Sequence, residues 1–150
     1  MASDPTAIRP AVLVDSCVLL DVITGDAQWA DWSAEQIAAA MDTGRFVINP
    51  LIYAEVSVGY ETLEELDELL PASDYERESL PYVAGFAAGK AFVRYRRQGG
   101  DKRSPMPGFY IGAHAVVAGY GLLTRDARRY RTYFPNLNII APEGSILGYE

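Results

Sequence analysis

A short apolar run that ends in a carboxylate is the feature that most limits how this chain can fold. The run is Ala11–Val14, and Asp15 follows it directly. Because its residues do not alternate with polar ones, the run is typical of a strand buried on both faces, as in a parallel sheet covered by helices. Asp15 would then stand at the carboxyl end of a strand, where ligand crevices of open α/β sheets form. It could equally be the N-cap of a helix that begins at Ser16.

Strand and helix patterns alternate along the rest of the chain. We expect a helix from Ser16 that ends at Gly25, and further strands at 46–48, 122–124 and 138–141. Further helices are expected at 29–41, 51–58, 62–70, 80–98, 109–118 and 127–133, with a polar turn after Pro71. There is no internal repeat and no linker. The pattern therefore predicts one domain over residues 1–150, with a core of about 11–142, built as an α/β sandwich around a mainly parallel sheet.

Composition excludes several other classes of protein. With one cysteine, Cys17, among 150 residues, we expect no disulfide framework. No apolar run approaches the roughly 20 residues that cross a bilayer, and the first residues lack the pattern of a signal peptide. We therefore expect a cytoplasmic protein that does not contact a membrane. There is no P-loop, and the single histidine, His114, lies among small apolar residues and is predicted to be a hydrogen-bonded core residue.

Charge is distributed unevenly in this chain, whose net charge is −7. The first 89 residues contain 3 Lys and Arg but 16 Asp and Glu, whereas the remainder contains 10 basic and 4 acidic residues. Lys90, Arg94 and Arg97 follow helical spacing and form one basic stripe, which the loop residues Lys102 and Arg103 extend. This surface is a candidate for binding a polyanion. The alternative is that it pairs with the acidic helix at 62–70.

Three carboxylates are the candidates for a functional site. Asp15 and Asp126 each follow a strand, and parallel strands end at the same edge of a sheet. Glu55, on the helix after the second strand, can reach that edge. Its apolar neighbours would draw it inward, although an exposed place on the helix is the alternative. Clustered carboxylates repel one another unless a cation compensates, and oxygen ligands suit Mg²⁺ or Mn²⁺, which can activate water for attack on a phosphodiester.

Ordered segments between residues 12 and 142 carry a family resemblance. They are Val14–Asp21, Asn49–Ser57, Phe109–Ala115 and Leu122–Asp126, followed by Tyr130, Tyr133, Phe134, Pro135 and Ile139–Pro142. Together these segments resemble PIN-domain proteins, and more narrowly the VapC-type toxins of toxin–antitoxin pairs. The resemblance implies a PIN-like three-layer α/β/α sandwich and an endoribonuclease that depends on Mg²⁺ or Mn²⁺. It also implies RNA as the substrate, a cognate antitoxin as a partner, and a homodimer.

The resemblance also assigns roles to residues. It implies that Asp15, Glu55 and Asp126 are catalytic and metal-binding, together with one more carboxylate at the start of the helix that holds His114. At that position this chain has Gly108. The resemblance implies an active ribonuclease, but fewer carboxylate ligands bind a divalent ion less tightly, so the residues of this chain imply an impaired one. The alternative is an inactive PIN-fold module that only binds an antitoxin or another protein.

Gly108 leaves three accounts open. The chain could be a laboratory or escape variant of an active toxin, a natural inactive member, or one in which another group, such as Asp101 or a water, replaces the missing ligand. We expect Gly108→Asp to keep the fold, tighten binding of Mg²⁺ or Mn²⁺, and raise ribonuclease activity. The basic stripe is expected to border the acidic crevice and to bind RNA phosphates in a salt-dependent manner. Its residues are Lys90, Arg94, Arg97, Lys102 and Arg103.

Overall fold

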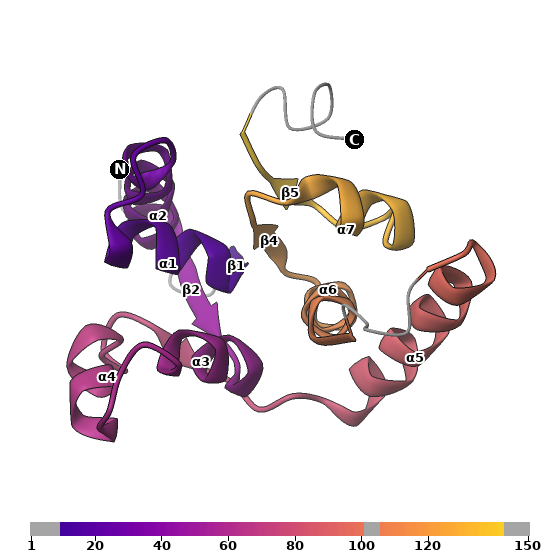
Figure 1. Ribbon diagram of the computed structural model, residues 1–150, viewed down its shortest axis with the longest axis horizontal. Coiled ribbons are helices and arrows are strands. Elements are labelled where there is room, and N and C mark those ends of the chain that lie inside the picture. The colour runs from indigo at the N-terminus through magenta and orange to yellow at the C-terminus, as the bar shows by residue number, and fades with distance from the viewer. Residues whose placement is uncertain (1–9, 101–105, 143–150) are drawn as a thin grey trace, which may run out of the picture.

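Five parallel strands form a sheet in the computed structural model, which describes residues 10–100 and 106–142 (Figure 1). The strands are β1 (Ala11–Val14), β2 (Arg45–Ile48), β3 (Glu76–Arg77), β4 (Gly121–Leu123) and β5 (Ile139–Ile140). Their order across the sheet is β3-β2-β1-β4-β5. In the central strand, Leu13 pairs with Val47 of β2 on one side and with Leu122 of β4 on the other. Asp15, which follows the central strand, therefore lies in the middle of the edge formed by the carboxyl ends of the strands.

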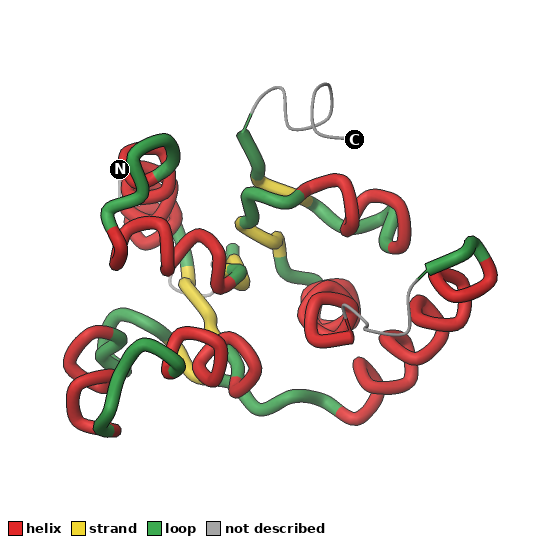
Figure 2. The backbone as a smooth tube through the Cα atoms, viewed as in Figure 1, coloured by secondary structure: helices red, strands yellow, loops and turns green. Residues whose placement is uncertain are grey.

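Helices lie on both sides of this sheet. They are α1 (Ser16–Thr24), α2 (Ala30–Thr43), α3 (Pro50–Ser57), α4 (Leu63–Leu69), α5 (Tyr82–Arg97), α6 (Met106–Ala118) and α7 (Ala127–Tyr133). Helices α1 and α2 lie on one side of the row of strands, and α6 and α7 lie on the other, with α5 packed outside α6 (Figures 1 and 2). The predicted α/β sandwich around a parallel sheet is thus confirmed.

The core lies where the sheet meets these helices. Leu13 and Val14 of β1 are fully buried, as are Leu122 and Leu123 of β4. This burial explains why the strands read as unbroken apolar runs, since a parallel strand covered on both faces has no solvent-facing side. The helix ends follow local chemistry. The Asn49 side chain, for example, accepts a hydrogen bond from a backbone N–H in the first turn of α3.

Two elements differ from the sequence prediction. The segment predicted as a polar turn contains β3, a two-residue edge strand whose Glu76 pairs in register with Val47. A strand this short, made of charged residues, carries no apolar signal. Helix α6 begins at Met106 rather than at Phe109, so Gly108 lies in its first turn. The predictions for Lys102 and Arg103, and the alternative role of Asp101, fall outside the described residues.

None of the helices in the described part of the chain is both long enough and apolar enough to cross a membrane.

Candidate acidic site at the strand ends

Asp15 lies just beyond β1 and is almost wholly buried, with 7% of its surface exposed. Its backbone N–H donates to the carbonyl of Leu123 in β4 at 2.8 Å. Its Oδ2 accepts hydrogen bonds from Thr124 Oγ1 at 2.8 Å and from the Tyr130 hydroxyl at 3.0 Å. Burial raises the pKa of the Asp15 carboxyl, and the two hydroxyls oppose that shift only in part. Asp15 does occupy the N-cap position of α1, but its side chain makes no capping hydrogen bond.

Glu55 approaches Asp15 from α3 but is not drawn into the core. The helix buries Ile52 and Val56 instead, and Glu55 is exposed, so the expectation that its apolar neighbours pull it inward is wrong. Its carboxylate nevertheless faces the site, because Glu55 Oε1 accepts a hydrogen bond from Ser16 Oγ at 2.8 Å. Partial burial and, to a smaller extent, the charge of Asp15 raise the pKa of Glu55. The two carboxylates thus interact across Ser16.

Asp126 is connected to this pair through Thr124, two residues before it in the chain, and its carboxylate lies near Arg129. Its backbone N–H donates to Thr124 Oγ1 at 3.0 Å, and that hydroxyl in turn donates to Asp15. Its side chain is 52% exposed, and its Oδ2 lies 3.7 Å from Arg129 Nη2. The structure therefore brings Asp15 and Glu55 together, and it connects Asp126 to them through its backbone and through Thr124 rather than through its carboxylate.

Gly108 lies beside the same site. A Cβ at this residue would be 2.8 Å from Arg129 Nη1 and 3.7 Å from the hydroxyl of Tyr130, which binds Asp15. Gly108 is itself buried in the first turn of α6. A side chain at residue 108 would therefore meet the Arg129 guanidinium and the hydrogen-bond donor of Asp15.

These residues do not fit a divalent ion in their present arrangement. Within residues 10–100 and 106–142, no group of three or more His, Cys, Asp and Glu side chains is placed to hold a metal. Asp15 Oδ2 already accepts two hydroxyl donors, and Glu55 accepts one. The Asp126 carboxylate turns toward Arg129, whose guanidinium brings a positive charge to the site. The binding of Mg²⁺ or Mn²⁺ by Asp15, Glu55 and Asp126 stays a prediction.

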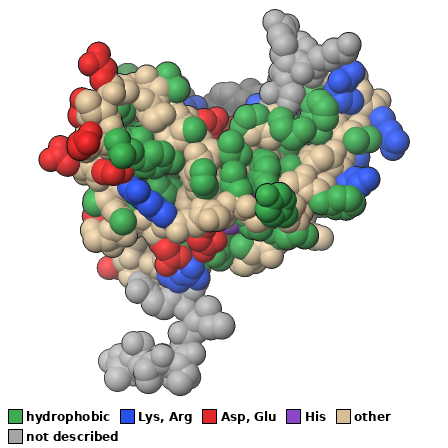
Figure 3. Space-filling model, turned by 90° about the horizontal axis from the view of Figure 1, so that it is seen from below, with side chains coloured by type: hydrophobic (Ala, Val, Ile, Leu, Met, Phe, Trp, Pro, Cys, Tyr) green, Lys and Arg blue, Asp and Glu red, His purple; other side chains and the backbone are tan. Residues whose placement is uncertain are grey.

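The basic stripe on α5 is exposed and reaches toward α7. Arg94 Nη2 donates to the backbone carbonyl of Tyr133 at 2.7 Å and packs over the Tyr133 ring, while Lys90 and Arg97 are exposed. Lys and Arg side chains gather at the end of the molecule where α5 lies, and Asp and Glu at the opposite end (Figure 3). Helices α4 and α5 lie well apart in Figure 1, and among the described residues no ion pair joins them. The alternative of pairing with the acidic helix is therefore not observed.

A groove of about 910 Å³ lies beside Asp126, and the stripe residues Lys90, Arg94 and Arg97 do not line it. Basic and aromatic side chains make up much of its lining: Trp29, Tyr95, Arg125, Arg128, Arg129 and Tyr133. Asp126 borders it, whereas Asp15 and Glu55 do not. Cys17 also lines it, and burial raises the pKa of this thiol to about 12, which disfavours the thiolate. Guanidinium groups and half-buried rings in one groove are suited to phosphates and bases.

An ion pair at this groove, between a buried carboxylate and a partly exposed guanidinium, was not predicted from the sequence. Asp21 is 3% exposed, and its two carboxylate oxygens accept from Arg125 Nε at 2.7 Å and from Nη2 at 2.8 Å. Ser33 Oγ, also buried, donates to it at 3.0 Å. Thr124 and Tyr130, the donors to Asp15, were likewise not assigned to the site. A carboxylate inside an apolar helix is a signal for a buried partner, but nothing local indicates which residue that partner is.

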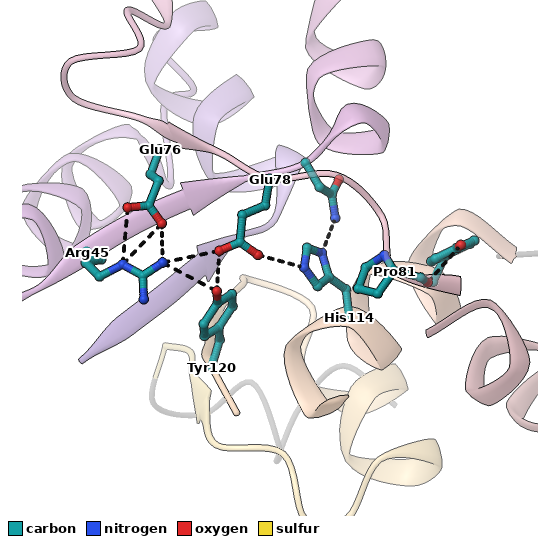
Figure 4. A network of polar contacts seen from close by, with 8 residues as sticks. Arg45, Glu76, Glu78, Pro81, His114 and Tyr120 are labelled. Carbon is teal, nitrogen blue, oxygen red and sulfur yellow. Dashed lines mark hydrogen bonds and ion pairs between the residues drawn. The ribbon is translucent and has the colours of Figure 1, made fainter. Parts of the chain in front are cut away.

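His114 is a hydrogen-bonded core residue, as predicted. It is fully buried, its Nδ1 lies 3.0 Å from Asn49 Nδ2, and its Nε2 lies 3.3 Å from Glu78 Oε1. Figure 4 shows that Glu78 also meets Tyr120 and Arg45, and that Arg45 holds Glu76 of β3. This network fastens the edge strand to α6 and lies apart from the residues around Asp15.

Solved structures share this fold. A chain in the VapBC2 complex of Rickettsia felis bound to a promoter DNA fragment is 15% identical with a TM-score of 0.68, and the match covers 87% of this chain and 98% of that one. A chain of VapBC-1 from nontypeable Haemophilus influenzae is 15% identical with a TM-score of 0.67, and the match covers 87% of this chain and 97% of that one. A chain of DNA-bound VapBC from Salmonella typhimurium is 18% identical with a TM-score of 0.65, and the match covers 88% of this chain and 98% of that one. No family model matches the chain, and no curated protein matches it significantly. The likeness therefore establishes the fold, which agrees with the resemblance in the sequence.

Proposed function

We propose that this chain is a VapC-type PIN-domain toxin of a toxin–antitoxin pair, acting in the cytoplasm, whose ribonuclease chemistry is impaired. The observation that carries the proposal is the placement of Asp15. It is a buried carboxylate at the end of the central strand, its hydrogen-bond donors are neutral, and Glu55 lies across Ser16 from it. A buried carboxylate without a cation partner destabilises a fold, so such a residue points to function rather than to stability.

The groove supports RNA as the substrate. Arg129 and the other guanidinium groups along it can bind phosphates, and Trp29 and Tyr133 offer rings on which bases can stack. The proposal assigns Mg²⁺ or Mn²⁺ to the unimpaired form of the site. In this chain, with Gly108 and Arg129 where the structure has them, no step through such an ion is derived.

RNA cleavage and growth arrest test the proposal. The chain should cleave total RNA weakly or not at all, whereas Gly108→Asp combined with Arg129→Ala should cleave it and should stop growth when expressed without an antitoxin. Adding Asp15→Asn to that variant should abolish both effects. Cleavage that persists after Asp15→Asn would show that the chemistry does not use this site.

A binding module without catalysis is the second candidate. It is favoured by the positive charge that Arg129 brings to the site and by exposed apolar side chains on α5, where Tyr82 is 97% and Phe86 is 68% exposed. Such side chains suit a protein interface, with an antitoxin or with a second copy of the chain. Co-purification with a small protein encoded beside it, a dimeric mass by light scattering, and no cleavage by any restored variant would establish this candidate instead.

A further inference from the structure

Arg129 occupies a central place in the acidic site. It lies on α7, one residue before Tyr130, which donates to Asp15. Its guanidinium lies 3.7 Å from the Asp126 carboxylate on one side, and on the other side it comes within 2.8 Å of where a Cβ of residue 108 would be. Its positive charge also acts on the carboxylate of Glu55. One side chain therefore interacts with two of the three predicted ligands and reaches the position of the missing fourth.

Gly108 makes room for this arrangement. A heavy-atom contact of 2.8 Å is closer than a real Cβ tolerates, and the Arg129 Cδ would lie 3.4 Å away. Any side chain at residue 108 would displace the end of Arg129, which can move because its side chain is 40% exposed. A carboxylate introduced there would lie next to a guanidinium, and a planar guanidinium binds carboxylates readily.

We infer that Gly108 and Arg129 act as a pair in which the guanidinium replaces a divalent ion as the positive charge of this site. The chain would then compensate the charges of Asp126 and Glu55 without metal. Restoring a carboxylate at residue 108 would by itself create an ion pair with Arg129 rather than a metal site. A metal site would require both changes. This inference concerns the charges in the site and stands whether or not the chain cleaves RNA.

Binding of Mn²⁺ to four purified forms tests the inference by calorimetry, with electron paramagnetic resonance of free Mn²⁺ as a second readout. The forms are the unchanged chain, Gly108→Asp, Arg129→Ala and the double variant. The unchanged chain should bind Mn²⁺ weakly, and each single variant should differ from it only slightly. The double variant should bind at least about tenfold more tightly than either single variant, because changes at residues in contact are not additive.

Arg131→Ala is the matched control, since it removes the same charge from an exposed position on the same helix. In combination with Gly108→Asp it should not reproduce the gain, which separates a local effect of Arg129 from general electrostatics. Thermal unfolding of each form without metal should show that all remain folded. The inference is overturned if Gly108→Asp alone tightens Mn²⁺ binding as much as the double variant does. It is also overturned if the unchanged chain already binds as tightly, or if Arg131→Ala serves as well as Arg129→Ala.

Discussion

Two aspartates, Asp21 within α1 and Asp15 at the N-cap of that helix, are almost equally buried, yet their partners differ in kind. Asp21 is 3% exposed and is bound through both oxygens by the guanidinium of Arg125. Asp15 is 7% exposed and receives hydrogen bonds from the hydroxyls of Thr124 and Tyr130. The first carboxylate therefore has a compensating charge fixed beside it, whereas the second has only neutral donors.

The difference in partners means that the Asp21 carboxylate stabilises the fold, whereas the Asp15 carboxylate does not contribute stability through an ion pair. The pair of Asp21 and Arg125 joins α1 to the segment after β4, 104 positions away in sequence. Removing one member of such a pair leaves an uncompensated charge, which is costly. Asp15 is already without a cation, so the fold does not depend on its charge. Under the proposed function, Asp15 would reduce stability as active-site residues commonly do.

Arg125→Ala should have the largest effect on stability. It leaves the buried carboxylate of Asp21 without its cation, and we expect a loss of about 3 kcal/mol in the free energy of unfolding. Urea denaturation measures this, with Arg128→Ala, an exposed arginine of equal charge, as the control. If the two variants lost equal stability, Asp21 would not depend on its ion pair and the comparison would fail.

Tyr130→Phe should lower the free energy of unfolding less than Arg125→Ala does. It removes one of the two hydroxyls that bind Asp15 Oδ2 while keeping the buried ring, and we expect a loss of about 1 to 2 kcal/mol. Tyr133→Phe is the matched control, because its hydroxyl bonds to Gln98 at the surface at 2.9 Å, where water can replace it. Equal losses in the two variants would mean that the Asp15 carboxylate gains nothing from the Tyr130 hydroxyl.

Asp15→Asn should change stability least among the buried positions. The amide keeps an oxygen that can accept from Thr124 and Tyr130 and removes a buried charge, so the free energy of unfolding should stay within about 1 kcal/mol or rise. The same urea experiment measures it. A loss as large as that of Arg125→Ala would place Asp15 in the same structural class as Asp21.

The local elements of this fold could be predicted because local patterns determine them. The apolar run of β1 and the position of Asp15 after it follow from burial of a central parallel strand. Partners far apart in sequence could not be predicted, since nothing near Asp21 or near Asp15 indicates Arg125 or Tyr130. Such partners are set by the packing of α7 against the sheet edge.

Two further differences have local causes. The orientation of Glu55 was ambiguous because both the buried and the exposed faces of α3 border it, and burial of Ile52 and Val56 decided it. Strand β3 was missed because its two charged residues are stabilised by strand pairing and, at Glu76, by Arg45 rather than by apolar packing. Of the candidate site, the position of Asp15 was predictable, whereas the place of Arg129 beside Gly108 and Asp126 was not.

Asp67 offers an exposed counterpart to both buried aspartates, and the smallest effect. Its Oδ1 accepts hydrogen bonds from the Tyr53 hydroxyl at 2.6 Å and from Arg77 Nη2 at 2.8 Å, so it has both a neutral and a charged donor. Unlike the two buried aspartates, its side chain is 42% exposed. The Tyr53 hydroxyl and then Arg77 hold the pKa of Asp67 below its ordinary value. A carboxyl with a lowered pKa in the folded state adds stability above its unfolded pKa, and that stability is lost as pH falls through the folded value.

Asp67→Asn should therefore lower the urea midpoint slightly at neutral pH, and the difference from the unchanged chain should shrink as the pH falls below about 4. Glu68→Gln, at an exposed position on the same helix, is the control for removing one charge from this helix. Because solvent screens exposed ion pairs, the effect should be far below that of Arg125→Ala. An Asp67 effect as large as the Arg125 effect would mean that donor type alone, and not burial, sets the cost of losing a partner. The contrast between Asp15 and Asp21 would then need another explanation.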